Sequence, residues 1–397
     1  MRIAKIETFA ADGGLRRLHF LKITTDQGLV GWSEFGDGRP GLGGLARLIA
    51  KIGEWVIGQD PRACGRLVTD LYAAIRFAHA GLNAQAIAAI ENACLDIKAK
   101  ALGCAVHELF GGALRDNIPV YWSQCGMHRV LSPEFCQQHA LRTLRSLADV
   151  EALGAEVRER GFSALKTKIM RFGTHADSAS VHMPGFAPVG AGPALNATLE
   201  ILSDVEGLIS AFRAGAGPDV EIILDANFNF RTEGFIRVAR VLERHNVRWL
   251  EADVLHPATL ATIRRSTRTP IGSLEAVLGR RAFLPFLEQQ AVDVAIIDVM
   301  WNGFTESLAM AALADAYETS VALHNYAGSL AATIGAHFAA LIPNLTTMEI
   351  EVDGVQQCDA LLKDPPRVEL GFFQLPKGPG WGCEVDEAAL ARHVVVQ

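Results

Sequence analysis

The sequence predicts an α/β fold in which a (β/α) barrel follows a separate α+β block. The barrel is predicted because polar side chains end six apolar, strand-like runs at intervals of 23 to 26 residues. These side chains are Asp225, Glu251, Glu275, Asp298, His324 and Glu349. One strand, one helix and two loops fill about 25 residues at their usual lengths. Barrel strands carry their catalytic groups at the carboxyl ends, so the six side chains should meet at one mouth.

The block that precedes the barrel has another pattern. Three strand-like runs lie at residues 2–9, 18–25 and 29–34. Three stretches with helical periodicity follow at residues 44–56, 61–80 and 83–102. Strands followed by helices, without alternation, indicate an α+β unit that is distinct from the repeating units downstream.

The barrel itself should begin at residues 118–124, IPVYWSQ, and its second strand should be residues 164–170, ALKTKIM. Later helices are expected between the strands that end in the six polar side chains. They fall at residues 199–216, 232–245, 257–267, 279–288, 303–318 and 329–342. Two long stretches, 125–148 and 171–198, interrupt the early units, and we expect both to help cover the barrel mouth.

Composition excludes several classes of protein. The chain has 397 residues, enough for two domains, and its net charge of −7 without a basic tract argues against a nucleic-acid partner. No run is long enough to span a bilayer, and the N-terminus lacks the apolar core of a signal peptide. The seven cysteines are dispersed and form no CxxC pair. We therefore expect a cytoplasmic protein with reduced thiols and no membrane association.

Two lysines on the second barrel strand are candidates for a catalytic base. Lys166 and Lys168 alternate with Leu165, Thr167 and Ile169, so both lysines share one face. The apolar face must pack under helices, which turns the lysines into the barrel. A lysine held beside another cation has a lowered pKa and can accept a proton near neutral pH.

Three acids on successive strands predict a metal site. Asp225, Glu251 and Glu275 would form a triply negative cluster of oxygen ligands, which is costly in a barrel mouth unless a cation compensates it. Oxygen-only ligation favours Mg²⁺, with Mn²⁺ as the alternative.

The next two strands end in a carboxylate and an imidazole. Asp298 can orient the ring of His324 and leave its other nitrogen free for proton transfer. A base on one side of a cation and this dyad on the other suit removal of the proton α to a carboxylate, because the metal stabilises the resulting enediolate.

At these residues the chain resembles the enolase superfamily, in particular its mandelate-racemase-like subgroup. The motif KTK is similar to the family's KxK motif, and DAN to its first metal-ligand strand. The resemblance implies Lys168 as the base, Lys166 as a contact to the substrate carboxylate and Asn227 as a substrate contact. It also implies Glu349 as the acid that hydrogen-bonds the substrate carboxylate opposite the metal.

The family fold implies three parts: an α+β capping domain at residues 1–117, a modified (β/α) TIM barrel at 118–354, and a segment at 355–397 that returns to the capping domain. Two loops of the capping domain select the substrate in this family. Here they would be Ala11–Arg17, which carries the candidate substrate-binding residues Arg16 and Arg17, and Phe35–Gly44. Asp253 and Leu274 depart from the family pattern, which commonly has proline and glycine there.

The resemblance implies an Mg²⁺-dependent enzyme that acts on a small-molecule carboxylate, first of all an acid-sugar dehydratase. A racemase, an epimerase or a lactone cycloisomerase would use the same two proton-transfer groups. Two other classes stay open: a metal-independent barrel lyase with a Schiff base at Lys166 or Lys168, and a metal-binding module without turnover. We also expect a homo-oligomer.

Overall fold

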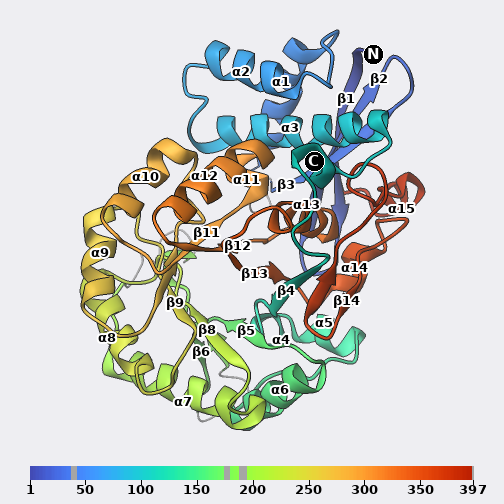
Figure 1. Ribbon diagram of the computed structural model, residues 1–397. Coiled ribbons are helices and arrows are strands. Elements are labelled where there is room, and N and C mark those ends of the chain that lie inside the picture. The colour runs from blue at the N-terminus through green and yellow to red at the C-terminus, as the bar shows by residue number, and fades with distance from the viewer. Residues whose placement is uncertain (37–42, 174–178, 187–194, 396–397) are drawn as a thin grey trace.

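The structure is a computed structural model that describes residues 1–36, 43–173, 179–186 and 195–395 (Figure 1). An eight-stranded parallel barrel forms its centre, because each strand pairs with the next and the last, β13, pairs with the first, β4. The strands are β4 (Asn117–Trp122), β5 (Ala164–Thr167), β8 (Glu221–Asp225), β9 (Trp249–Glu251), β10 (Ile271–Ser273), β11 (Val294–Ile297), β12 (Ser320–Leu323) and β13 (Leu345–Ile350). The predicted barrel is therefore confirmed.

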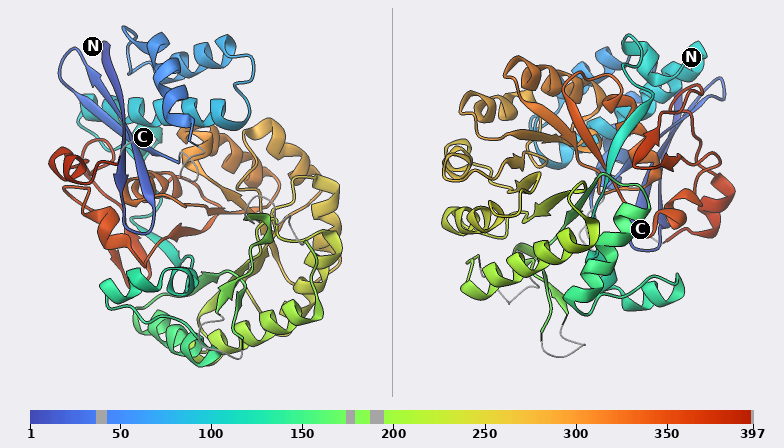
Figure 2. Two further views of the ribbon diagram at one scale, coloured as in Figure 1. Left: turned by 180° about the vertical axis from the view of Figure 1, so that it is seen from behind. Right: turned by 60° about the horizontal axis from the view of Figure 1, so that its bottom comes forward.

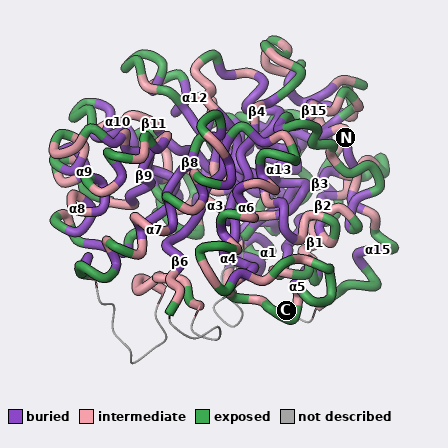
Figure 3. Tube along the Cα trace, turned by 90° about the horizontal axis from the view of Figure 1, so that it is seen from below, coloured by how far each residue is buried: buried purple, intermediate pink, exposed green. Residues whose placement is uncertain are grey.

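Helices surround this barrel and contribute apolar residues to a shared core. The buried residues lie towards the centre of the molecule (Figure 3). They are α6 (Leu147–Glu159), α7 (Leu199–Ala216), α8 (Thr232–Leu242), α9 (Pro257–Arg265), α10 (Arg280–Glu288), α11 (Val299–Asn302), α12 (Phe304–Ala316) and α13 (Ser329–Ala339). The six helices predicted after residue 198 all form, and several end two to three residues earlier than expected. No helix in the described part of the chain is both long and apolar enough to cross a membrane.

The N-terminal block is a three-stranded antiparallel sheet covered by helices. Its elements are β1 (Ile3–Asp12), β2 (Arg17–Thr25), β3 (Val30–Phe35), α1 (Leu45–Val56), α2 (Cys64–Ala74), α3 (Gly81–Leu102) and the 3₁₀ helix η1 (Val106–Phe110). α3 is buried along most of its length, because it packs against this sheet and also against the barrel helices α11 and α12. The block therefore covers one side of the barrel (Figure 1).

The C-terminal segment lies beside the N-terminal sheet in all three ribbon views (Figure 2). It contains α14 (Val355–Asp359), β14 (Val368–Glu369), β15 (Phe372–Gln374) and α15 (Glu387–Arg392). Trp381 is buried and donates its indole N–H to the carbonyl of Trp32 in β3, at 3.0 Å. Two backbone hydrogen bonds also join β1 to the C-terminal segment: Asp12 N donates to His393 O, and Val395 N donates to Ala10 O. The tail thus completes the capping domain.

Of the two insertions after the first strands, the first is fully described and the second only in part. The first contains α4 (Met127–Leu131) and α5 (Pro133–Gln138). The second contains the small hairpin of β6 (Met170–Arg171) and β7 (Ser180–Val181) and a 3₁₀ turn, η3 (Pro184–Phe186). Residues 174–178 and 187–194 of the second insertion, and 37–42 of the capping-domain loop, lie outside the described residues, so their predicted covering role stays a prediction.

Candidate active site

The period of two in a β-strand explains how the site is built. Inside the barrel six side chains form a buried apolar floor. They are Tyr121, Ala164, Ile223, Trp249, Ile296 and Ala322. The residue two positions after each floor residue faces the same interior but lies nearer the mouth. Those residues are Ser123, Lys166, Asp225, Glu251, Asp298 and His324.

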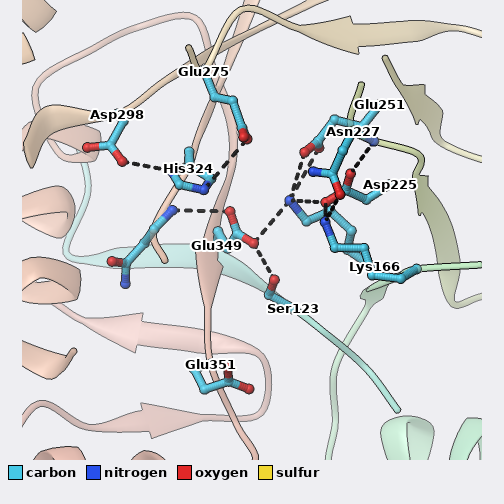
Figure 4. Close-up of polar contacts among 12 residues, drawn as sticks. Ser123, Lys166, Asp225, Asn227, Glu251, Glu275, Asp298, His324, Glu349 and Glu351 are labelled. Atoms are coloured by element: carbon cyan, nitrogen blue, oxygen red, sulfur yellow. Dashed lines mark hydrogen bonds and ion pairs between the residues drawn. The ribbon is translucent and has the colours of Figure 1, made fainter. Parts of the chain in front are cut away.

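The lysines and the first two acids form one side of the site (Figure 4). Lys166 Nζ lies 3.0 Å from Glu251 Oε1, 3.5 Å from Asp225 Oδ2 and 3.0 Å from Glu349 Oε1. Lys168 contacts Asp225 and donates a 2.7 Å hydrogen bond to Asn227 Oδ1. Both lysines contact acids at the ends of other barrel strands, so their face of the strand points inward.

The electrostatics of this side depend on its carboxylates. Burial acts to lower the pKa of Lys166, but Glu251 and Glu349 raise it well above its ordinary value. The lowered lysine pKa that the sequence suggested is therefore not found at Lys166, because three acids surround its amine. In the opposite sense, burial acts to raise the pKa of Asp225, but Lys168 and Lys166 lower it to about 2.

The other side of the site is the Asp298–His324 dyad. His324 Nδ1 lies 2.6 Å from Asp298 Oδ2, and its Nε2 lies 3.6 Å from Glu275 Oε2. Asp298 also accepts a hydrogen bond from Trp301 N at 2.9 Å, so it caps α11 while it holds the ring. Burial acts to lower the pKa of His324, but Glu275 and Asp298 raise it to about 10.

Glu349 lies between the two sides (Figure 4). It accepts hydrogen bonds from the hydroxyl of Ser123 and, at 3.1 Å, from Asn325 N. Burial acts to raise the pKa of Glu349, whereas Lys166 and His324 lower it below its ordinary value. The ionised carboxylate of Glu349 thus pairs with the amine of Lys166.

The three predicted metal ligands follow adjacent strands, but their side chains face different partners. Asp225 and Glu251 contact Lys166, and Glu275 is turned to His324. Leu274 before Glu275 has a φ of 95°, a conformation that side chains rarely adopt and that explains why glycine suits this position. Among the described residues, no three histidine, cysteine or acidic side chains are already gathered around one point.

The donor set nevertheless fits a hard divalent cation. All its ligand atoms are carboxylate oxygens, the kind that Mg²⁺ prefers. Burial and the neighbouring Asp225 raise the pKa of Glu251 well above its ordinary value, which is the cost that a cation removes. Asp253 adds a fourth carboxylate, and its Oδ1 is buried without a hydrogen-bond partner among the described residues.

Of the three predicted substrate-binding residues, Asn227 and Arg16 lie at the barrel mouth and Arg17 is exposed. Asn227 is buried beside Lys168 and has a φ of 44°, a left-handed conformation that a 2.9 Å hydrogen bond from its N–H to Asp225 Oδ1 supports. Arg16 reaches the barrel and pairs with Glu351. Arg17 is exposed at the start of β2, and its role stays a prediction.

Sequence reasoning missed Ser123 and Glu351. Ser123 could have been found, because it lies two residues after Tyr121 on the same face of the first barrel strand. Glu351 lies two residues after Glu349, so the same alternation brings it to the mouth. Neither residue belongs to a motif that draws attention to it.

Comparisons with known proteins agree with this geometry. The model of the mandelate racemase / muconate lactonizing enzyme N-terminal domain matches residues 12–111, and the enolase C-terminal domain-like model matches residues 149–389. The chain is 40% identical to a protein of Burkholderia xenovorans strain LB400 that is provisionally named an L-alanine-DL-glutamate epimerase. The crystal structure of that protein gives a TM-score of 0.93 and covers 99% of this chain and 98% of the other. A second structure under the same name, bound to magnesium and fumarate, gives a TM-score of 0.92 over 99% of this chain and 96% of the other.

Curated relatives carry several activities. D-xylonate dehydratase of Haloferax volcanii is 27% identical, over 99% of this chain and 89% of the relative. D-galactarolactone cycloisomerase of Agrobacterium fabrum is 27% identical, over 94% of this chain and 91% of the relative. These relatives are all named as enzymes. The chain therefore belongs to the enolase superfamily, as an enzyme of its mandelate racemase/muconate lactonizing type.

Proposed function

We propose that the protein removes the proton α to the carboxylate of a polyhydroxy acid and then expels the β-hydroxyl as water. The observation that carries this proposal is the position of two proton-transfer groups on opposite sides of Glu349 (Figure 4). The lysine amines lie on one side, and the imidazole of His324 lies on the other. The D-xylonate dehydratase among the relatives supports dehydration of an acid sugar.

In this proposal Lys168 is the base. Its amine takes the α-proton, and the electron pair of the broken C–H bond moves onto the substrate carboxylate to give an enediolate. Lys166 binds that carboxylate through its amine, and Glu349, 3.0 Å from that amine, holds the lysine in position. Asn227 contacts both Lys168 and, through its backbone N–H, Asp225, so it fixes the lysine relative to the strand ends.

His324 is the acid in the second step. It gives a proton to the β-hydroxyl as the C–O bond breaks, and the enol that remains becomes a 2-keto-3-deoxy acid. Asp298 holds the ring through Nδ1, so Nε2 is the nitrogen that faces the site. Burial of the dyad keeps bulk water from competing for that proton.

Asp225, Glu251 and Glu275 would hold the divalent cation, Mg²⁺ or Mn²⁺. When bound, it supplies electrostatic stabilisation of the charge that develops on the substrate carboxylate. The magnesium in the structure of the 40% identical relative supports Mg²⁺ as the first choice. We further propose the domain limits 1–117, 118–354 and 355–397, and assembly as a homo-oligomer.

Incubation with a panel of aldonic and aldaric acids, with Mg²⁺ in D₂O, tests the function. We expect a keto acid to form from at least one of them. Lys168→Met should abolish both keto-acid formation and α-deuterium exchange. His324→Asn should abolish keto-acid formation but keep exchange, because the lysine alone removes and returns the α-proton.

Lys51→Met is a matched control, because Lys51 is an exposed lysine on α1. It should leave both readouts unchanged. No keto acid from any of the acids, or exchange that survives in Lys168→Met, would contradict the proposal. Activity that resists EDTA, together with borohydride trapping of substrate on a lysine, would favour the Schiff-base lyase instead.

Epimerisation or racemisation is the second candidate. Two proton-transfer groups on opposite faces also suit removal and return of one proton, and the relative with 40% identity is provisionally named an epimerase. α-Deuterium incorporation into a recovered substrate of inverted configuration, without loss of water, would establish this reaction in place of dehydration.

A further inference from the structure

The floor of the barrel contains a side chain that hydrogen-bonds directly to one of the candidate metal ligands. Trp249 lies on β9, two residues before Glu251, and its indole N–H donates to Glu251 Oε2 at 3.4 Å. The mechanism proposed above gives this contact no role. An indole N–H can only donate, so a buried one needs an acceptor. Here the acceptor is a carboxylate of the site itself.

The neighbours of Trp249 hold its indole in one orientation. Gly272 on the adjacent strand β10 lies against the ring, since a Cβ atom at this glycine would meet Trp249 Cδ1 at 2.5 Å and Nε1 at 2.7 Å. The ring of Tyr121 meets the indole edge to face, with centroids 6.2 Å apart and planes at 87°. The guanidinium of Arg248 lies 5.2 Å from the ring centroid. Trp249 is also 0% exposed, so its ring has no room to turn away from Glu251.

Glu251 is held by two donors that differ in what else they do. Lys166 Nζ lies 3.0 Å from Glu251 Oε1 and 3.3 Å from Oε2, and it faces Glu251 in Figure 4. In the proposed mechanism Lys166 also binds the substrate carboxylate, so the substrate shares its amine. Trp249 lies below Glu251 in the floor, and its single N–H has no second acceptor to serve. The contact from Trp249 is therefore the one that the substrate does not share.

An uncharged donor is suited to a carboxylate that binds a cation. The indole N–H fixes the position of Glu251 without supplying a positive charge that would repel the cation. It also occupies one of the roughly four lone-pair directions of the carboxylate and leaves the others free. Hydrogen bonds of this kind orient ligating carboxylates, and their loss typically costs about 10–100-fold in metal affinity.

We propose that Trp249 is a positioning residue for Glu251, and that its indole N–H holds the carboxylate in the orientation in which it binds the divalent cation. This inference rests on the proposed function, because it takes Glu251 to be a metal ligand. It requires that the affinity for the cation depends on the N–H itself, and not only on the volume that the ring fills in the floor.

Calorimetric titration of the metal-free protein with MgCl₂ tests this requirement. Trp249→Phe removes the N–H together with part of the ring. Replacement of Trp249 by 3-benzothienylalanine, introduced at an amber codon, keeps the bicyclic shape and puts a sulfur atom where the N–H was. Both changes should raise the Kd for Mg²⁺ about tenfold or more. Trp55→Phe is the matched control at an exposed position on α1, and it should leave the Kd unchanged.

The Tm of the metal-free variants separates positioning from packing. Trp249→Phe leaves a gap in the floor and should lower this Tm. The benzothienyl ring fills the same space, so its variant should keep a Tm near that of the wild type and still bind Mg²⁺ more weakly. An unchanged Kd in the benzothienylalanine variant would overturn the proposal, whether or not Trp249→Phe folds.

Failure of this inference can be told apart from failure of the proposed function. If the wild type binds Mg²⁺ and the benzothienylalanine variant binds it equally well, only the positioning role falls. If both replacements of Trp249 weaken Mg²⁺ binding but the wild type forms no keto acid from any of the acids, the positioning role stands and dehydration falls. If the wild type does not bind Mg²⁺, both proposals are overturned.

Discussion

Glu34 offers a quantitative test of how the capping domain holds the barrel. It lies on β3 and is 1% exposed, and its carboxylate accepts hydrogen bonds from Gly328 N at 2.5 Å and Ala331 N at 3.0 Å. These N–H groups belong to the first turn of α13, so an acid of the capping domain caps a barrel helix. Replacing Glu34 with glutamine keeps an acceptor in place and removes the charge.

The magnitude follows from the pKa of this carboxyl. Burial raises the pKa of Glu34 from its ordinary 4.5 to about 7, although the two backbone donors and Arg16 act to lower it. Between pH 4.5 and 7 the folded protein therefore holds a proton that the unfolded chain has released. The resulting stability is fully present below pH 4.5 and is lost as the pH rises through 7. The difference amounts to about 3 kcal/mol over the whole window.

Urea denaturation of the wild type and Glu34→Gln at pH 5 and pH 8 measures this difference. Glutamine does not ionise at this position. The free energy of unfolding of the variant minus that of the wild type should therefore rise by about 2–3 kcal/mol from pH 5 to pH 8. Glu54→Gln, at an exposed glutamate, should track the wild type at both values. Parallel pH dependences of wild type and Glu34→Gln would refute the assignment of a proton to Glu34.

Three further variants address the barrel. Asp298→Asn should lower kcat about 10²–10⁴-fold with little change in Tm. Asparagine caps α11 as well as aspartate does, but it no longer stabilises the charged ring of His324. A large fall in Tm would contradict this expectation. Asp253→Asn should weaken Mg²⁺ binding, measured by calorimetry, about 10–100-fold, and unchanged affinity would show that its unpaired Oδ1 does not act on the metal. Arg129→Met should lower the free energy of unfolding, measured by urea denaturation, by about 3–5 kcal/mol, because Asp353, 2.9 Å away, is left buried and unpaired. Adding Asp353→Asn should recover part of that loss. No recovery would contradict the pairing.

The strand ends of the barrel could be predicted because their signal is local and repeated. Several of the side chains at the mouth end apolar runs, and the residue two positions earlier packs into the floor, as Trp249 does for Glu251 and Ala322 for His324. A period of two along a strand, repeated about every 25 residues, is therefore visible in the sequence alone. The lysine face of β5 could be assigned for the same reason.

The contacts between elements could not be predicted in this way. Arg16 and Glu351 are 335 residues apart, and neither is part of a repeat that would pair them. The direction in which Glu275 turns is set by His324 and by the left-handed backbone at Leu274, which no periodicity reveals. Sequence spacing places a residue at the mouth, but the partners that compete for it decide where its side chain points.

Two acids of the capping domain show why these contacts matter for catalysis. Glu34 caps α13, which follows the strand of His324, and Glu91 on α3 hydrogen-bonds with Thr305 in the first turn of α12, which follows the strand of Asp298. The helices behind both members of the dyad are therefore fixed by carboxylates from outside the barrel. Because the hydrogen bond in the dyad is 2.6 Å long, a small shift of either helix would lengthen it. The capping domain thus contacts the acid side of the site through the ends of these two helices.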